Sequence, residues 1–151
     1  MTGLNDLIFV DTNIFVYSAD STSKFQNQAK KIVEKFVNRE LMGVISLQIL
    51  LEFYSLITNK KRFKNFYSQI EATDFVRNLI SVGNFKLIYP NVDSVSTVVN
   101  ILESKMVVDR EIFDAAIIAT MITNNVTTIY TANDKDFKAL SSEIEVVNPF
   151  A

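Results

Sequence analysis

The sequence predicts an α/β fold, in which a mainly parallel sheet of four to five strands is covered by helices on both faces. Short apolar runs alternate along the chain with longer segments whose apolar residues recur at helical spacing, a pattern typical of such sheets. The 151 residues are enough for about one domain, and only 3 glycines and 2 prolines interrupt them, which indicates short connections. We therefore expect residues 1–151 to form a single domain.

Five segments are predicted as strands. The first, residues 7–10, is a continuous apolar run that ends at Asp11, as expected of a buried parallel strand. The third stops at Pro90, and the fourth is rich in β-branched residues. The remaining predicted strands are residues 43–45, 85–89, 126–131 and 144–147.

Helices are predicted between these strands from apolar residues three and four positions apart. Ser23 is a candidate start for the first helix, and Ser46 and Asp109 are candidate N-caps for later ones. Asp93 or Ser94 begins the helix that precedes Asp109. The predicted helices cover residues 29–37, 47–58, 67–81, 95–106, 110–123 and 134–140.

The composition limits the possible classes of protein. The chain contains no cysteine and no histidine, which excludes a disulfide scaffold and leaves only oxygen ligands for a metal. No apolar run reaches the roughly 18 residues that a membrane-spanning helix needs. Residues 1–6 lack the basic segment of a secretory signal. We therefore expect a cytoplasmic protein without a membrane partner.

The charges are distributed unevenly. The net charge of −2 gives no electrostatic argument for a nucleic-acid partner. Residues 24–86 nevertheless hold 11 basic and 5 acidic residues, whereas residues 87–151 hold 4 basic and 9 acidic residues. This pattern fits a basic nucleic-acid track beside an acidic site, and it also fits two solvated faces of opposite sign.

Three acidic residues each lie in an apolar run: Asp11, Glu52 and Asp114. A carboxylate in apolar surroundings needs a partner, a metal or a proton. Each acid alone fits a turn, a helix rim or a helix terminus. Together they are expected at the carboxyl edge of the sheet, where open α/β sheets bind ligands. An oxygen-only cluster there suits Mg²⁺ or Mn²⁺, which lowers the pKa of a water and neutralises phosphate in phosphodiester hydrolysis.

Four segments of the chain resemble, in order, the four motifs of PIN domains. They are Val10–Asn13, Glu52 following Ile45–Ser46, residues 113–119 and residues 131–137. The resemblance spans nearly the whole chain and implies a three-layer α/β/α sandwich with Mg²⁺- or Mn²⁺-dependent endoribonuclease activity. A stand-alone domain of this size is most similar to the VapC toxins of toxin–antitoxin pairs. The resemblance thus implies an RNA substrate, a cognate antitoxin and a homodimer.

The same resemblance implies roles for individual residues. Asp11 and Asp114 correspond to the principal metal ligands, and Glu52 completes the catalytic acids. Three further residues, Asn13, Thr131 and Asn133, would hold Asp11 and the fourth motif in place.

The fourth motif leaves two acids as candidates. Asp134 directly follows the position that the shorter family motif fills with aspartate, so we expect it among the catalytic acids. Asp136 corresponds to the later acid of a longer variant, so we expect it among the metal ligands. Which of the two supplies the fourth carboxylate stays open at this point.

Residues 59–67 interleave basic and aromatic side chains. The segment could grip a phosphate backbone and stack bases, or its aromatic side chains could enter the core or a dimer contact. The candidate RNA-binding residues are Lys60, Lys61, Arg62 and Lys64.

Three other functions compete with a ribonuclease. A PIN-like fold without activity could serve as a binding or scaffold module, although its acids would then have no purpose. HAD-type phosphatases carry a second aspartate where this chain has Asn13, and a receiver domain needs an acid where the third strand ends at Tyr89-Pro90.

Overall fold

A five-stranded parallel sheet forms the centre of the computed structural model, which describes residues 6–151. The expectation about the N-terminal segment falls largely on residues 1–5, outside the described part. The strand order is β3-β2-β1-β4-β5, which confirms the predicted α/β class. The strands are β1 (Leu7–Val10), β2 (Met42–Ser46), β3 (Lys86–Ile88), β4 (Thr128–Tyr130) and β5 (Glu145–Val147).

The first strand lies in the middle of the sheet because both of its edges are paired. Phe9 aligns with Val44 on β2 and with Ile129 on β4, and all three side chains are fully buried. A central parallel strand is covered on both faces, which explains why residues 7–10 read as a continuous apolar run.

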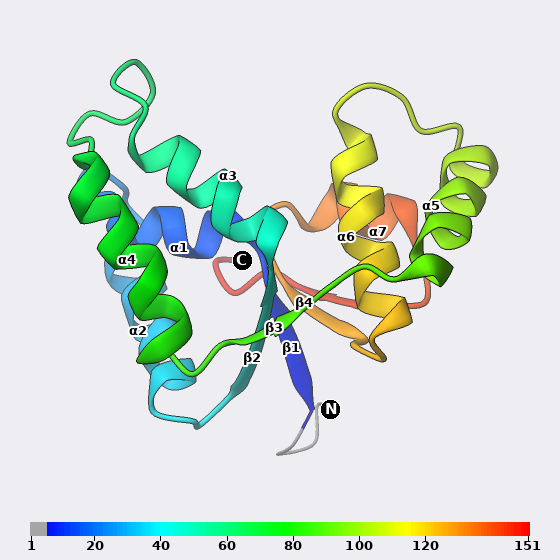
Figure 1. Cartoon of the computed structure of the whole chain (residues 1–151), viewed down its shortest axis with the longest axis horizontal. Helices are drawn as coiled ribbons and strands as arrows, with labels where there is room; N and C mark the ends of the chain where they lie inside the picture. The colour runs from blue at the N-terminus through cyan, green and yellow to red at the C-terminus, as the bar shows by residue number, and fades with distance from the viewer. Residues whose placement is uncertain (1–5) are drawn as a thin grey trace.

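Helices cover both faces of the sheet, as the three-layer prediction requires. Figure 1 shows α1 to α4 on one side of the strands and α5 to α7 on the other. No helix within residues 6–151 is long and apolar enough to cross a membrane. The helices are α1 (Thr12–Ala19), α2 (Gln26–Val37), α3 (Leu47–Ile57), α4 (Gln69–Ser81), α5 (Val92–Lys105), α6 (Glu111–Thr123) and α7 (Asp134–Leu140).

Several helix starts differ from the prediction for local reasons. α4 begins at Gln69 because Ser68 and Glu71 form a reciprocal capping box. A second capping box starts α5 from Asn91 instead of Asp93 or Ser94. The expected Asp109 cap is wrong: Asp109 has a left-handed φ of 56°, and Arg110 occupies the N-cap position of α6.

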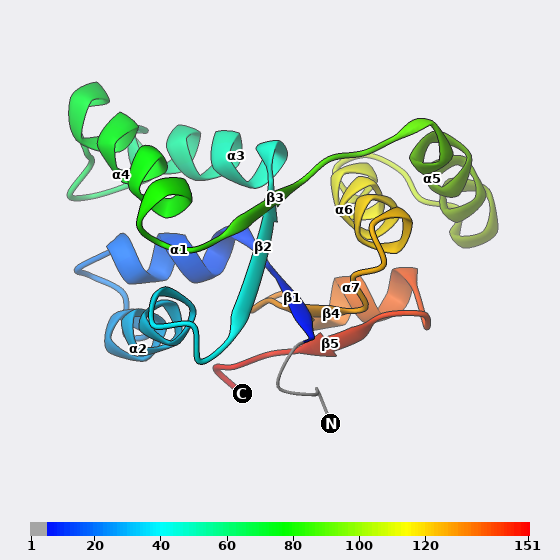
Figure 2. The same ribbon diagram turned by 60° about the horizontal axis from the view of Figure 1, so that its bottom comes forward.

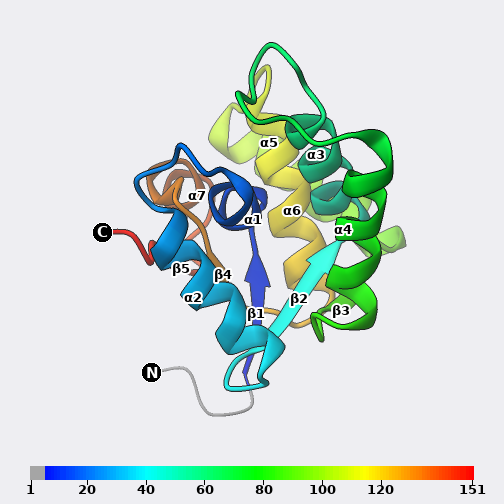
Figure 3. The same ribbon diagram turned by 90° about the vertical axis from the view of Figure 1, so that its left-hand side faces the viewer.

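The parallel arrangement brings the carboxyl ends of β1, β2 and β4 to one edge. In Figure 3 the arrows of β1 and β2 both point toward the end of the molecule that holds α1 and the first turn of α3. Figure 2 shows α3 and α6 on opposite sides of these strands. The segments with unusual acids therefore meet where strands end and helices begin.

Candidate active site

Asp11 is the most buried acid at this edge, with a relative exposure of 7%. It directly follows β1 and is the N-cap of α1, where its Oδ1 accepts a hydrogen bond from the Thr12 backbone N–H at 2.8 Å. Burial raises the pKa of Asp11, while the hydrogen bonds of Thr131 and Thr12 partly oppose this shift. The chain thus keeps a carboxylate deep in the fold by surrounding it with donors.

The other oxygen of Asp11 is held by two side chains. Thr131 Oγ1 donates to Asp11 Oδ2 at 2.7 Å, and Asn13 Nδ2 donates to the same oxygen at 3.0 Å. Asn13 Oδ1 accepts from the Ala132 backbone N–H at 3.0 Å, and the Asn133 N–H donates to Thr131 Oγ1 at 2.9 Å. This network joins the segment after β4 to the start of α1.

Glu52 reaches the same region from α3. Its Oε2 accepts from Thr12 Oγ1 at 2.8 Å, and its Oε1 accepts from Gln48 Nε2 at 2.8 Å. Glu52 also raises the pKa of Asp11 through charge repulsion, so the two carboxylates belong to one electrostatic cluster. Thr12 thus links Glu52 to the neighbourhood of Asp11, which lies 41 positions earlier in the sequence.

Asp114 enters from the opposite side of the sheet, in the first turn of α6. Its pKa is raised to about 7, chiefly by burial and then by repulsion from Asp11, Asp136, Glu52 and Glu111. Three other predicted acids, Asp11, Asp136 and Glu52, therefore act electrostatically on the half-buried carboxyl of Asp114. A carboxyl whose pKa lies this far above its usual range marks a site that lacks positive charge.

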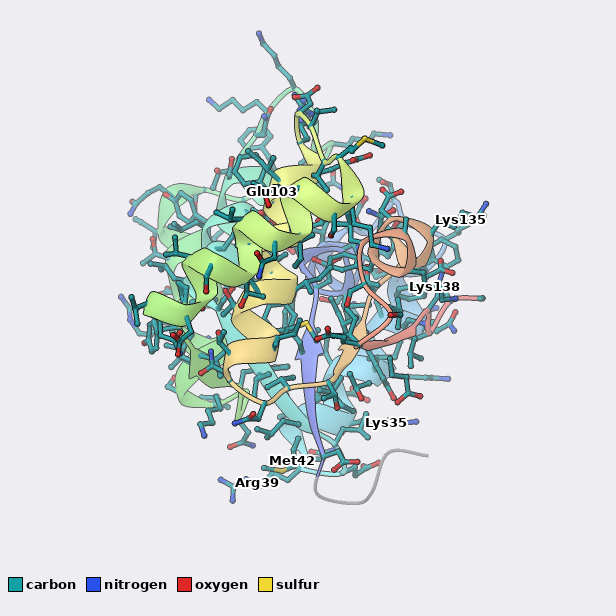
Figure 4. All side chains as sticks on the ribbon, turned by 90° about the vertical axis from the view of Figure 1, so that its right-hand side faces the viewer. Lys35, Arg39, Met42, Glu103, Lys135 and Lys138 are labelled. Carbon is teal, nitrogen blue, oxygen red and sulfur yellow. The ribbon has the colours of Figure 1, made fainter. Side chains whose placement is uncertain are left out.

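The two candidate acids of the fourth motif differ in their surroundings. Asp134 accepts from Asn148 Nδ2 at 2.9 Å and from Lys138 Nζ at 3.3 Å, and both donors lower its pKa. Figure 4 shows Lys138 beside α7 at the outer edge of the molecule. Asp136 instead repels Asp114, while Asp134 is not among the groups that shift the pKa of Asp114. Of the two acids, Asp136 is thus the one that acts electrostatically on Asp114.

The donor set suits a hard divalent cation, although the acids do not form a closed cage. Among residues 6–151, no three acidic side chains are arranged so that they would hold an ion by themselves. Mg²⁺ is commonly held by one or two carboxylates together with waters and substrate phosphates. Oxygen-only ligands and the mutual repulsion at Asp114 therefore fit Mg²⁺ or Mn²⁺ shared with a bound phosphodiester.

The predicted basic segment, residues 59–67, lies largely at the surface, but not all of its aromatic side chains are exposed. Phe63 is buried in the core, whereas Phe66 is exposed and lies 5.4 Å from Lys60 Nζ, ring centroid to nitrogen. Asn65 and Tyr67 tie the segment to the end of α1 through Ser21 and the Ala19 carbonyl. The cations Lys60, Lys61, Arg62 and Lys64 are all exposed.

An apolar groove of about 1300 Å³ adjoins the acids between α3, α5 and α6. Leu51, Val95 and Phe113 line it with relative exposures of 60%, 65% and 54%. Glu52 stands in its wall, as does Arg62 of the basic segment. Large apolar side chains exposed together in this way are typical of a surface that binds a partner.

Two polar residues of the cleft are absent from the sequence prediction. Thr12 and Gln48 hold the two oxygens of Glu52, and neither residue type is unusual at its position. The signal for Gln48 is its spacing, because residues four apart on a helix share a face. The signal for Thr12 is its place beside Asp11, at the start of α1.

The fold has known counterparts among toxin–antitoxin proteins. VapBC-1 from nontypeable Haemophilus influenzae is 16% identical with a TM-score of 0.66, covering 96% of this chain and 99% of that chain. VapBC2 from Rickettsia felis, bound to a promoter DNA fragment, is 19% identical with a TM-score of 0.64, covering 94% and 98%. The sarcin–ricin loop cleaving toxin VapC20 from Mycobacterium tuberculosis is 15% identical with a TM-score of 0.65, covering 91% and 98%.

Sequence comparison gives a more direct assignment. No curated protein matches the chain. The PIN domain family model matches residues 8–143, which include Asp11, Glu52, Asp114 and Asp136. This match covers most of the chain, from the second residue of β1 to the segment after α7, and contains β2, β3 and β4 entirely. The chain therefore belongs to the PIN domain family.

Proposed function

We propose that this protein is a Mg²⁺- or Mn²⁺-dependent endoribonuclease and the toxin of a toxin–antitoxin pair. The observation that carries the proposal is the convergence of Asp11, Glu52, Asp114 and Asp136 on one edge of the sheet, with the pKa of Asp114 raised to about 7. Clustered acids that repel one another serve no purpose in a scaffold, whereas a site that binds a cation and a phosphodiester needs their negative charge.

Asp11, Asp114 and Asp136 are the proposed metal ligands, and Glu52 is the proposed further catalytic acid. A divalent cation held there would neutralise charge on the phosphate and lower the pKa of a water, which on losing its proton becomes the nucleophile. Thr131 and Asn13 orient Asp11 by donating to its Oδ2, and both hydrogen bonds oppose the rise in its pKa that burial causes. Since three donors already engage Asp11, its carboxylate is poorly placed to act as the nucleophile of a phosphatase.

The RNA is proposed to approach over the exposed basic segment. Lys60, Lys61 and Lys64 are exposed and can meet phosphates, and Phe66, whose ring lies beside Lys60, is exposed for stacking. Arg62 lines the groove beside Glu52, so it joins the segment to the acids. Two other basic residues of the region 24–86 lie elsewhere: Figure 4 shows Lys35 and Arg39 at the end of the molecule where the strands begin.

Two protein partners belong to the proposal. A toxin–antitoxin complex from Klebsiella pneumoniae has a similar fold, with a TM-score of 0.59 at 21% identity, and from this likeness we infer a cognate antitoxin for this chain. We also infer a homodimer, for which the apolar groove beside Leu51 and Val95 offers a surface. The whole chain acts as one nuclease domain in the cytoplasm, where the RNA substrate is found.

The test is cleavage of a fluorescently labelled single-stranded RNA by the purified chain. Cleavage is expected with Mg²⁺ or Mn²⁺ and should stop with EDTA. Asp11→Asn and Asp114→Asn should abolish it. Glu103→Gln is the matched control, because Glu103 is an exposed acid on α5, away from the cluster (Figure 4).

Two outcomes speak against the proposal. Cleavage that survives exhaustive chelation would exclude the metal mechanism. A folded chain that binds RNA but never cuts it, under any divalent metal, would favour a binding or scaffold module instead.

A further inference from the structure

The amide of Gln48 lies between the two helices that carry acids from opposite faces of the sheet. Its Nε2 donates to Glu52 Oε1 at 2.8 Å within α3, and it also lies 3.4 Å from the Phe113 carbonyl oxygen in α6. Figure 1 places α3 and α6 on opposite sides of the strands. Gln48 is therefore a direct polar link across the carboxyl edge of the sheet.

Glu52 needs such a link because its side chain is long and its position is only half-buried. Thr12 Oγ1 fixes one oxygen at 2.8 Å from α1, and Gln48 fixes the other from one turn earlier in α3. Hydrogen bonds to an ionised carboxylate are stronger than those between neutral groups. With both oxygens engaged, Glu52 is held in one orientation.

The contact with Phe113 extends this restraint to Asp114, the next residue in the first turn of α6. Glu52 and Asp114 repel each other, so the gap between their helices tends to widen when no cation lies between them. An amide that donates to both sides opposes that widening without adding charge. A lysine at this position would instead neutralise Glu52 and compete with a metal.

We propose that Gln48 is a positioning residue, which orients Glu52 and sets its separation from Asp114, and so tunes the affinity of the acid cluster for a divalent cation. The inference rests on the proposed function, since it assumes that the cluster binds a metal. Gln48 itself is not proposed to touch RNA or metal. Thr12 is its partner in holding Glu52.

The experiment compares Gln48→Met with Gln69→Met. Methionine keeps the length of glutamine but cannot donate, and Gln69 begins α4 with the same kind of contact, Nε2 to Thr73 Oγ1 four residues on. Mn²⁺ binding to each RNA-free protein is measured by electron paramagnetic resonance, which counts free Mn²⁺. Melting temperature and the kcat and KM for RNA cleavage are measured alongside.

Gln48→Met is expected to weaken Mn²⁺ binding and lower kcat by about 10-fold, the low end of the effect of such outer partners, with KM for RNA nearly unchanged. Gln69→Met should behave like wild type. The decisive arm combines Gln48→Met with Glu52→Gln: if Gln48 acts through Glu52, the double variant binds Mn²⁺ no more weakly than Glu52→Gln alone.

The outcomes are separable. Wild-type Mn²⁺ affinity in folded Gln48→Met, or additive losses in the double variant, overturns the positioning role. Mn²⁺ binding is measured without RNA. If the wild type does not cleave RNA, the proposed function is rejected, but the effect of Gln48→Met on Mn²⁺ binding still tests the positioning role. If Gln48→Met fails to fold, Gln48→Asn replaces it, since the shorter amide cannot span the same distances. Thr12→Val should mimic Gln48→Met, and Thr12→Ser should restore wild-type binding.

Discussion

Thr131 Oγ1 donates a 2.7 Å hydrogen bond to Asp11 Oδ2, although 120 positions separate the two residues in the chain. Both side chains are buried, and each follows a strand, β4 and β1, that pair directly in the sheet. The same hydroxyl accepts from the Asn133 N–H at 2.9 Å. Thr131 thus serves the acid of the first motif and the backbone of the fourth motif at once.

Thr131→Val should destabilise the fold, because it removes a donor from a buried carboxylate without changing the volume of the side chain. We expect a loss of about 1–3 kcal/mol in the free energy of unfolding, measured by urea titration. Thr131→Ser should recover most of it. Thr73→Val, at a half-buried helical position whose hydroxyl bonds only within α4, is the control and should change little. Equal stability of Thr131→Val and wild type would contradict this account.

Asp114→Asn should stabilise the metal-free protein at alkaline pH while abolishing cleavage. The pKa of Asp114 is about 7 in the fold and 3.8 in the reference state, so the folded protein binds more protons between these values. Unfolding free energy therefore falls as pH rises from 4 to 7, and the penalty is complete above 7. We expect a gain of roughly 1–2 kcal/mol at pH 8, after allowing for solvent screening.

Melting curves at pH 5 and pH 8 measure this effect. The gain from Asp114→Asn should be small at pH 5, where most Asp114 is already protonated in the fold. Asp74→Asn, at an exposed acid paired with Arg77, serves as the control. A clear fall in melting temperature for Asp114→Asn at pH 8 would show that the carboxylate caps α6 more than it repels its neighbours.

Substitutions of the two acids of the fourth motif should have clearly different effects on the Mg²⁺ dependence of cleavage. Asp136→Asn removes a charge that repels Asp114, so it should raise the Mg²⁺ concentration needed for half-maximal cleavage and lower the pKa of Asp114. Asp134→Asn loses its ion pair with Lys138 and should retain nearly normal Mg²⁺ dependence. A Mg²⁺ titration of both variants decides between them. The reverse pattern would assign the role to Asp134, the other candidate from the sequence.

Metal binding should stabilise the protein in proportion to its occupancy. At a Mn²⁺ concentration about 100 times the dissociation constant, binding to the folded state alone adds about 2.7 kcal/mol. The melting temperature should rise with Mn²⁺ at pH 8 and return with EDTA. At pH 5 the rise should shrink, since protons compete for Asp114. An Asp11→Asn/Asp114→Asn double variant should show no Mn²⁺-dependent shift.

The sheet was predictable from the sequence because its central strands are buried on both faces. Residues 7–10 and 43–45 are apolar runs with no alternation, and the structure places them side by side at the centre. Helix starts were less predictable where backbone geometry decides. Asp109 looks like a cap in the sequence, yet its left-handed φ shifts the start of α6 to Glu111.

The acids were predictable as a set, but their partners were not. Asp11, Glu52 and Asp114 are conspicuous because each lies among apolar residues. The choice between Asp134 and Asp136 depends on Asn148, which follows β5 and binds Asp134 only once the sheet has formed. Thr12 gains its role only when α1 and α3 lie side by side, whereas the bond from Gln48 to Glu52 follows from their spacing within α3.

The strand order determines when, during synthesis, the acid cluster and the side chains that hold it can assemble. β1 is made first, but its second neighbour, β4, ends only at Tyr130, and Thr131 follows it. A nascent chain that has emerged only as far as α5 holds Asp11 without the Thr131 donor and without Asp114. Domains fold as units once their segments are available. A growing chain therefore lacks the complete acid cluster until nearly all of its described length has emerged.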